Sequence, residues 1–105
     1  MVYYMCPKEE KEVTKMLVKF DGHNQAQAWK IMDGKDYRGL MSYQTEVITI
    51  DKEGWLVVHA LWRNTTKRHI GWFMKELGFT YQWARQLYDD NMMFNIFTGE
   101  VKEVA

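Results

Sequence analysis

The sequence predicts an α+β fold in which a small antiparallel sheet, built on a central hairpin, packs against two to three helices. Three observations support this prediction. Residues 43–62 contain two β-rich runs around a short turn, and residues 64–77 carry an apolar stripe with helical spacing. The chain has 105 residues, which is the size of one ordinary domain and too short for two. We therefore expect residues 1–105 to form a single domain.

The composition supports a packed core but no bulk charge. Hydrophobic residues make up 47% of the chain and aromatic residues 15%, whereas disordered chains have few aromatics. The 14 basic and 14 acidic residues cancel. This balance argues against a protein that coats nucleic acid through positive charge, and against an acidic mimic of DNA. Electrostatic binding must therefore come from local clusters.

The chain has the features of a cytoplasmic protein. Cys6 is the single cysteine, so no intrachain disulfide can form. No apolar run approaches the roughly 20 residues that span a bilayer, and residues 1–7 lack the basic and apolar regions of a signal peptide. We expect no membrane partner. Residues 1–15 are predicted to form a flexible or loosely attached extension.

The first third of the chain predicts one strand and one helix. Residues 16–20 form a short apolar run that ends at Asp21-Gly22, which predicts a strand followed by a turn. Asn24 can cap a helix that runs through Asp33, with Gly34 just beyond its end. The residues expected on the inner side of this helix are Ala28, Ile31 and Met32.

The central hairpin is the clearest β signal. Residues 43–50 are rich in β-branched side chains, residues 51–54 form a turn that ends in Gly54, and residues 55–62 form the return strand. The return strand is apolar on both faces. It is therefore either a central strand covered on both sides or a strand with one face left for a partner.

A helix is expected after residues 64–66, which are all of N-capping type. Its apolar stripe has i, i+3, i+4, i+7 spacing and comprises Ile70, Phe73, Met74 and Leu77. Gly78 should end the helix, and Phe79 should pack back on Met74.

A second helix and a last strand are expected to follow. Thr80 can cap the helix, and residues 89–91 end it. Its predicted inner residues are Ala84, Leu87 and Tyr88. Residues 93–97 are predicted to form the last strand, and residues 100–105 a tail.

Basic residues cluster where the first of these helices should begin. Three of them would occupy the first turn, where the helix macrodipole is already positive and where no acidic residue offsets them. Together with hydroxyl groups and free backbone N–H groups, they would form an anion site. The candidate contact residues are Arg63, Thr65, Thr66, Lys67, Arg68 and His69. The alternative is that the basic side chains pair with Glu46, Asp89 or Asp90, because charge clusters on helices are usually solvated faces.

Aromatic residues flank this cluster, namely Trp62, Trp72, Tyr81 and Trp83. Aromatic side chains beside Arg and Lys can stack nucleic-acid bases or anchor protein interfaces. Core filling is the expected role of Trp55 and Trp62. Trp72 and Trp83 suit either role, and we include both among the candidate contact residues.

No catalytic, metal or cofactor motif is present. The three histidines and Cys6 lack metal-ligand spacing, and the glycines form no phosphate-binding loop. His59 is expected to be a hydrogen-bonded core or half-buried residue. Ser42 is the single serine, and no local pattern marks it as a nucleophile. We predict a protein that is not an enzyme and that needs no cofactor.

Residues 46–74 resemble a group of small proteins encoded by bacteriophages of Gram-positive bacteria, in which a hairpin runs into a Thr-Thr, basic, His, aliphatic, aromatic helix. The matching residues are Thr65, Thr66, Arg68, His69, Ile70 and Phe73. The group has no agreed activity. The resemblance implies a phage origin, expression in a bacterial host cell, and a role in binding and blocking host machinery such as a CRISPR nuclease.

These observations lead to three functional hypotheses. The first is a phage-encoded binding protein that inhibits or redirects a host protein, with an anti-CRISPR inhibitor of an effector nuclease as one form. The second is a small nucleic-acid-binding module that uses the basic and aromatic residues at the helix start. The third is a homo-oligomeric phage accessory protein in which an exposed apolar strand face pairs with its own copy.

Overall fold

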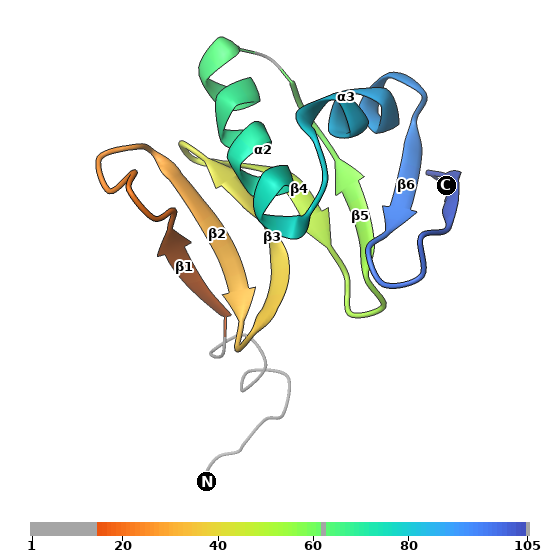
Figure 1. Cartoon of the computed structure of the whole chain (residues 1–105), viewed down its shortest axis with the longest axis horizontal. Coiled ribbons are helices and arrows are strands. Elements are labelled where there is room, and N and C mark those ends of the chain that lie inside the picture. Colours follow the sequence, from red (N-terminus) through yellow and green to blue (C-terminus); the bar gives the residue numbers. More distant parts are fainter. Residues whose placement is uncertain (1–14, 62, 105) are drawn as a thin grey trace, which may run out of the picture.

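The computed structural model describes residues 15–61 and 63–104, which form one sheet and two helices (Figure 1). The sheet has seven antiparallel strands, which lie side by side in the order of the chain. The elements are β1 (Lys15–Lys19), β2 (Ala28–Asp33), β3 (Asp36–Ser42), β4 (Thr45–Ile50), β5 (Trp55–Val58), α2 (Asn64–Leu77), α3 (Tyr81–Asp89), β6 (Met92–Asn95) and β7 (Val101–Glu103). The predicted α+β class is confirmed.

The central hairpin is formed by β4 and β5, as predicted. The Asp51 carboxylate stabilises its turn, because Oδ1 accepts the backbone N–H groups of Glu53 at 2.9 Å and Trp55 at 3.0 Å. The return strand is shorter than predicted and ends at Val58. Trp62 lies outside the described residues, so its predicted place in the core stays a prediction.

The helix predicted for residues 24–33 is wrong, because residues 28–33 form strand β2. Lys30 pairs with Val18 of β1 on one side and with Leu40 of β3 on the other. Ala28 and Ile31 are both buried, but they lie on opposite faces of this strand. Burial on two faces therefore produced the spacing that resembled a helix. Gly34, with a φ of 63°, lies in the turn from β2 to β3 and not beyond a helix.

Two further strands differ from the sequence prediction. Residues 36–42 had no assignment and form β3, between β2 and β4. Residues 100–105 were expected to be a tail, but Val101–Glu103 form β7 and pair with β6. The last predicted strand, 93–97, lies at 92–95. Strands β6 and β7, with four and three residues, lack enough residues to show an alternating pattern in the sequence.

Both helices follow the predicted pattern at most positions. Gly78 ends α2 in the left-handed conformation, and the N–H of Phe79 donates to the Met74 carbonyl at 2.7 Å. Thr80 caps α3 through its hydroxyl, which accepts the N–H of Trp83 at 3.1 Å. The inward orientation predicted for Tyr88 is wrong, since this residue is 40% exposed.

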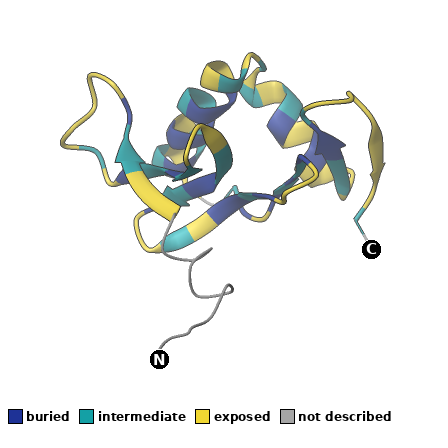
Figure 2. Cartoon of the chain, turned by 90° about the horizontal axis from the view of Figure 1, so that it is seen from below, coloured by how far each residue is buried: buried dark blue, intermediate teal, exposed yellow. Residues whose placement is uncertain are grey.

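The two helices pack on the same face of the sheet, and the core lies between the layers (Figures 1 and 2). Alternate residues of the central strands point into this core, and the helices contribute a matching apolar face. The largest fully buried apolar side chains are Leu40, Val47, Ile48, Leu56, Ile70, Phe73, Met74 and Leu87.

The other face of the sheet carries no described helix or strand (Figure 2). We call it the open face. Alternation along each strand and the pairing register place on it Leu17, Lys19, Trp29, Ile31, Met41, Thr49, Trp55, Val57, Met93 and Lys102. None of these residues belongs to the core cluster or packs against it. Ile31 is buried nonetheless, at 7% exposure. Trp55, which was expected to fill the core, therefore lies on the opposite side of the sheet.

Neighbouring valines on β5 test this assignment of faces. Val58 points into the core, and we expect Val58→Ala to lower the free energy of unfolding by about 2 kcal/mol through lost burial and a cavity. Val57 points to the open face, and Val57→Ala should cost less than about 1 kcal/mol. Urea denaturation of both variants measures the difference, and equal losses would contradict the assignment.

Candidate functional site

Helix α2 begins earlier than the sequence suggested, and this changes the predicted anion site. Arg63 is the N-cap residue, with an extended backbone and no side-chain capping hydrogen bond. Residues 64–66, which were expected to precede the helix as caps, form its first turn. Lys67, Arg68 and His69 therefore lie one turn further along the helix than predicted.

Two of the predicted contact residues face the sheet instead of the solvent. Thr66 and His69 are 4% and 2% exposed. Ser42 of β3 lies between them, with its Oγ 2.8 Å from His69 Nδ1 and 3.3 Å from Thr66 Oγ1. The three side chains form a buried polar cluster at the junction of β3 and α2, which we call the Ser42 cluster. The sequence linked Thr66 and His69 but left Ser42 out, because its partners are 24 and 27 residues away.

The environment of His69 disfavours its charged form. Burial is the main cause and lowers the pKa of His69 below its ordinary value, and the positive charges of Arg68, His23 and Lys19 lower it further. A neutral imidazole can either donate or accept at Nδ1, depending on its tautomer. The Ser42 hydroxyl can donate to Nδ1 in one tautomer and accept a hydrogen bond from it in the other.

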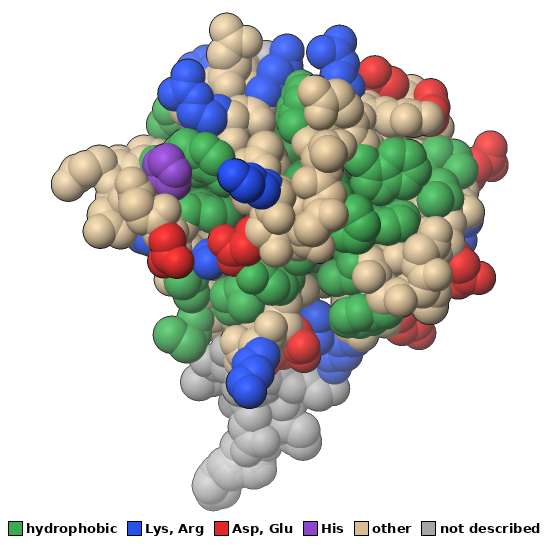
Figure 3. All heavy atoms as spheres, in the orientation of Figure 1, with side chains coloured by type: hydrophobic (Ala, Val, Ile, Leu, Met, Phe, Trp, Pro, Cys, Tyr) green, Lys and Arg blue, Asp and Glu red, His purple; other side chains and the backbone are tan. Residues whose placement is uncertain are grey.

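The basic side chains at the start of α2 have no carboxylate partner among the described residues. The ion pairs between described residues join Lys30 to Glu76, Arg38 to Asp36, and Arg85 to Asp89. The predicted alternative, in which Arg63, Lys67 and Arg68 pair with Glu46, Asp89 or Asp90, is therefore wrong for this part of the chain. Figure 3 shows basic side chains gathered at the end of the molecule where α2 begins.

The two candidate tryptophans, Trp72 and Trp83, pack against other residues of the domain. Trp72 stacks on the His23 ring at a centroid distance of 3.8 Å and meets Phe20 edge-on at 5.8 Å. Trp83 packs edge-on against Phe94 of β6 at 5.4 Å. Both indoles are partly buried against the core cluster. The structure thus gives each indole a packing role, and Trp72 also meets the ring of His69 at 5.2 Å.

A second polar contact fixes the other end of α2. The Glu76 carboxylate accepts hydrogen bonds from Lys30 Nζ at 2.7 Å and from the Tyr37 hydroxyl at 2.6 Å. Burial alone would raise the pKa of Glu76, but these two hydrogen bonds and the Lys30 charge give a net lowering. The hydrogen bond to Glu76, together with burial, raises the pKa of Tyr37 to about 12. Both groups therefore hold their usual charge at neutral pH.

A small cavity of about 170 Å³ adjoins the Ser42 cluster. Four of the six lining residues carry a hydroxyl group although most of the lining surface is apolar, Arg63 supplies a positive charge, and none of the described residues that form it is acidic. The lining residues are Ser42, Tyr43, Thr45, Val47, Arg63 and Thr66. Of the predicted contact residues, this cavity unites Arg63 and Thr66, while Thr65, Lys67 and Arg68 do not line it.

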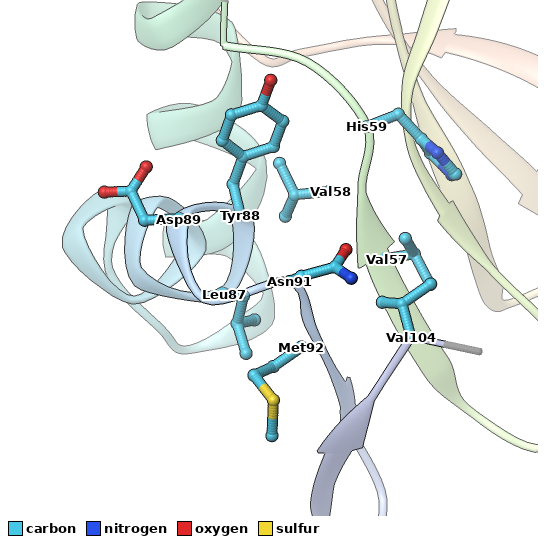
Figure 4. A pocket seen from close by; sticks show the side chains of 9 residues that line it. All are labelled: Val57, Val58, His59, Leu87, Tyr88, Asp89, Asn91, Met92 and Val104. Carbon is cyan, nitrogen blue, oxygen red and sulfur yellow. The ribbon is translucent and has the colours of Figure 1, made fainter.

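A larger cleft of about 500 Å³ lies between the end of α3 and strands β5 and β6 (Figure 4). Its polar groups do not form a catalytic arrangement. His59 and Asp89 lie on opposite sides of the cleft and point away from each other. His59 Nε2 is 2.8 Å from Thr49 Oγ1, and Asp89 pairs with Arg85 at 3.6 Å. His59 is hydrogen-bonded as expected, but it is exposed and not half-buried.

The open face adds a feature that the sequence analysis missed. Lys19 Nζ lies 4.2 Å from the ring centroid of Trp29, and Lys102 Nζ lies 4.2 Å from that of Trp55. Recognising this face requires the strand assignment of β2 and β7, which the sequence analysis did not make. The only signal for the open face in the sequence was that the residues of β5 are apolar on both faces of the strand.

The fold and these surfaces define a two-layer α+β domain in which the described helices cover one sheet face, with no metal-binding group of His, Cys, Asp or Glu side chains among the described residues. The chain belongs to a family of proteins of unknown function, DUF8033, whose match covers residues 14–90. This match spans β1 through α3 and ends before β6. No curated protein and no solved structure matches the chain. Neither α2 nor α3 is long and apolar enough to cross a membrane.

The burial of His69 should make the folded protein sensitive to mild acid. The unfolded chain keeps an ordinary histidine pKa of about 6.5, so it binds a proton below that pH more readily than the folded protein does. The stability contributed by neutral His69 is therefore complete above pH 6.5 and lost as the pH falls below it. In urea denaturation, His69→Asn should lose less stability between pH 7 and pH 5 than the wild type.

The exposed His59 supplies the control for this comparison. His59→Asn removes an exposed histidine outside the Ser42 cluster, and it is measured in parallel under the same conditions. Parallel curves for the wild type and His69→Asn would show that His69 does not carry the acid sensitivity.

Proposed function

We propose that this protein is a non-enzymatic binding protein that docks a protein partner on the open face of its sheet. The observation that carries the proposal is the set of large apolar side chains that point away from the core cluster. These side chains are Leu17, which is exposed, and Trp29, Met41, Trp55, Val57 and Met93, which are half-buried. Contiguous apolar surface on a small domain is the common mark of an interaction site.

The composition of the open face favours a protein as the partner. Tryptophan and methionine are enriched in the centres of protein interfaces, and tryptophan is a frequent hot-spot residue. Lys15, Asp36 and Glu46 surround these apolar side chains with charges of both signs. An apolar centre with a mixed polar rim is the usual anatomy of such an interface.

The proposal is non-enzymatic because several of the described groups with catalytic potential are engaged in the fold. His69 and Ser42 are buried in the polar cluster, and Glu76 holds α2 to the sheet. The His59 and Asp89 side chains diverge. A general base acts only within hydrogen-bond reach of the group it deprotonates, and none of these pairs opens such a site to the solvent.

The resemblance of residues 46–74 to small phage proteins suggests which partners to test first. Under this resemblance the partner is a bacterial host protein, with a CRISPR effector nuclease as one candidate, and the protein inhibits or redirects it. The hairpin and helix that carry the resemblance are β4, β5 and α2, and β5 contributes Trp55 and Val57 to the open face. A second copy of this chain is a further candidate for the same face.

Nucleic acid is the second candidate function, and the two lysine–tryptophan pairs favour it. Lysines beside half-buried indoles suit a single strand, whose bases stack and whose phosphates are negative. The acidic residues on the same face and the net charge of zero weigh against it. Binding of this kind should weaken steeply with added salt, whereas an apolar protein interface should lose less.

A charge placed in the middle of the open face should weaken partner binding. Val57→Glu introduces a carboxylate that a protein interface would have to desolvate, and we expect at least a tenfold loss of affinity. The test is affinity purification with the tagged protein from a bacterial host lysate, followed by calorimetry with each captured protein. The matched control is Gln86→Glu, which adds the same charge on the exposed side of α3.

Two results would decide against the proposal. Equal affinity of a captured partner for Val57→Glu and for the wild type would place the interface elsewhere. Tight binding of a single-stranded oligonucleotide, with quenched tryptophan fluorescence and a steep salt dependence, would favour the second candidate. Light scattering on the purified protein tests the second copy as the occupant.

A further inference from the structure

We propose that the cavity between the β3–β4 turn and the start of α2 binds a small oxyanion, a phosphate or a carboxylate group. This site is separate from the open face, and the inference goes beyond the proposed protein interface. The cavity of about 170 Å³ has room for roughly five water-sized groups. Four of its six lining residues carry hydroxyl groups, and the one charged residue, Arg63, is positive. Oxyanions accept hydrogen bonds from both hydroxyl and guanidinium groups.

The Arg63 side chain is available for a ligand. It forms no ion pair with any carboxylate in residues 15–61 and 63–104. A guanidinium group without an internal partner at the edge of a small cavity can bind an oxyanion through two parallel hydrogen bonds. The backbone N–H groups of the first turn of α2, which no side chain caps, add favourable partial charge from the same side.

The two buried hydroxyl groups can act as oriented donors. Ser42 and Thr66 are 3% and 4% exposed, yet both line the cavity. When neutral His69 carries its proton on Nδ1, it donates to Ser42 Oγ, and the Ser42 hydroxyl then donates to Thr66 Oγ1. The Thr66 hydroxyl is left to donate into the cavity. An anion in the cavity favours this tautomer, because it accepts that last hydrogen bond.

The conformation of Tyr43 provides a further argument. Its φ is 57°, in the left-handed region that costs a bulky residue of the order of 1 kcal/mol. Tyr43 is the first residue of the β3–β4 turn, where glycine or asparagine would be less strained. This strained turn holds a 47% exposed ring beside the cavity, with its centroid 5.9 Å from that of His69. The ring can therefore cover one side of a bound ligand.

The test is a titration of the ¹⁵N-labelled full chain with sodium phosphate and, separately, with sodium acetate, at an ionic strength kept constant with sodium chloride. We expect saturable shifts of the amide signals of Ser42, Tyr43 and Thr66. Tighter binding of phosphate than of acetate would indicate a phosphate group as the ligand, and the reverse order would indicate a carboxylate.

Single substitutions distinguish specific binding in the cavity from a general attraction of anions to basic residues. Arg63→Gln and Thr66→Val should each weaken binding tenfold or more, because each removes a hydrogen bond that the anion strengthens. Lys75→Gln removes the same charge at the far end of α2 and should change the affinity less than twofold. Tyr43→Asn keeps the left-handed turn and the buried polar cluster, so it tests the ring even if Thr66→Val fails to fold.

Two outcomes would overturn the proposal. Shifts that do not saturate, or that persist unchanged in Arg63→Gln, would mean an adventitious ion only. Shifts confined to residues outside the cavity would mean that the ion binds elsewhere. Val57→Glu should bind the anion as the wild type does, so a failure of the interface on the open face and a failure of this site can be distinguished.

Discussion

Two helices, of 14 and nine residues, must cover a sheet of seven strands, and they lie on one face only. A helix with its side chains is about 10–12 Å wide, so the pair covers roughly 20–24 Å. Seven strands at about 4.8 Å spacing span about 29 Å. The edge strands are accordingly less covered, with Met16 of β1 at 62% exposure and Val101 of β7 at 42%. The opposite face receives no described helix.

Polar contacts at both ends of α2 fix the helix on this sheet. The Ser42 cluster joins the start of α2 to β3, and Glu76 joins its end to Lys30 and Tyr37. Apolar packing tolerates small shifts of a helix, whereas hydrogen bonds are lost when the partners move apart. The two contacts therefore set the position of Arg63 relative to the β3–β4 turn. The contacts that hold α2 on the sheet therefore also shape the cavity between the start of α2 and the β3–β4 turn.

The end of α2, the start of α3 and the hairpin were predicted correctly, because the residues that determine them are close together in the sequence. Gly78 and Thr80 marked the end of α2 and the start of α3, and the β-branched run before Gly54 marked the hairpin. Strand β2 was mistaken for a helix because Ala28 and Ile31 are buried on opposite faces, which removes the alternation that identifies a strand. Strand β2 is defined by its pairing with β1 and β3, and a short stretch of sequence around β2 does not show this pairing.

The candidate site was only partly accessible from the sequence for the same reason. The basic residues at the start of α2 were found, and Arg63 and Thr66 among them share a cavity. Ser42 and Tyr43 became part of that site only when β3 came to lie under α2, because nothing within their own segment marks them. The start of α2 was placed three residues late because Asn64, Thr65 and Thr66 are capping types that here occupy helical positions. The open face required the whole sheet order, which no single segment encodes.

The sheet order also has a consequence for how the chain folds. Each strand pairs with the strand next to it in sequence, and the two helices occupy the single long connection, between β5 and β6. Most pairings therefore close short loops, which cost little entropy, and topologies of this kind fold quickly. During synthesis, each new strand meets a neighbour that has already left the ribosome. Helices α2 and α3 can then pack on the sheet formed by β1 to β5 before the β6–β7 hairpin is added.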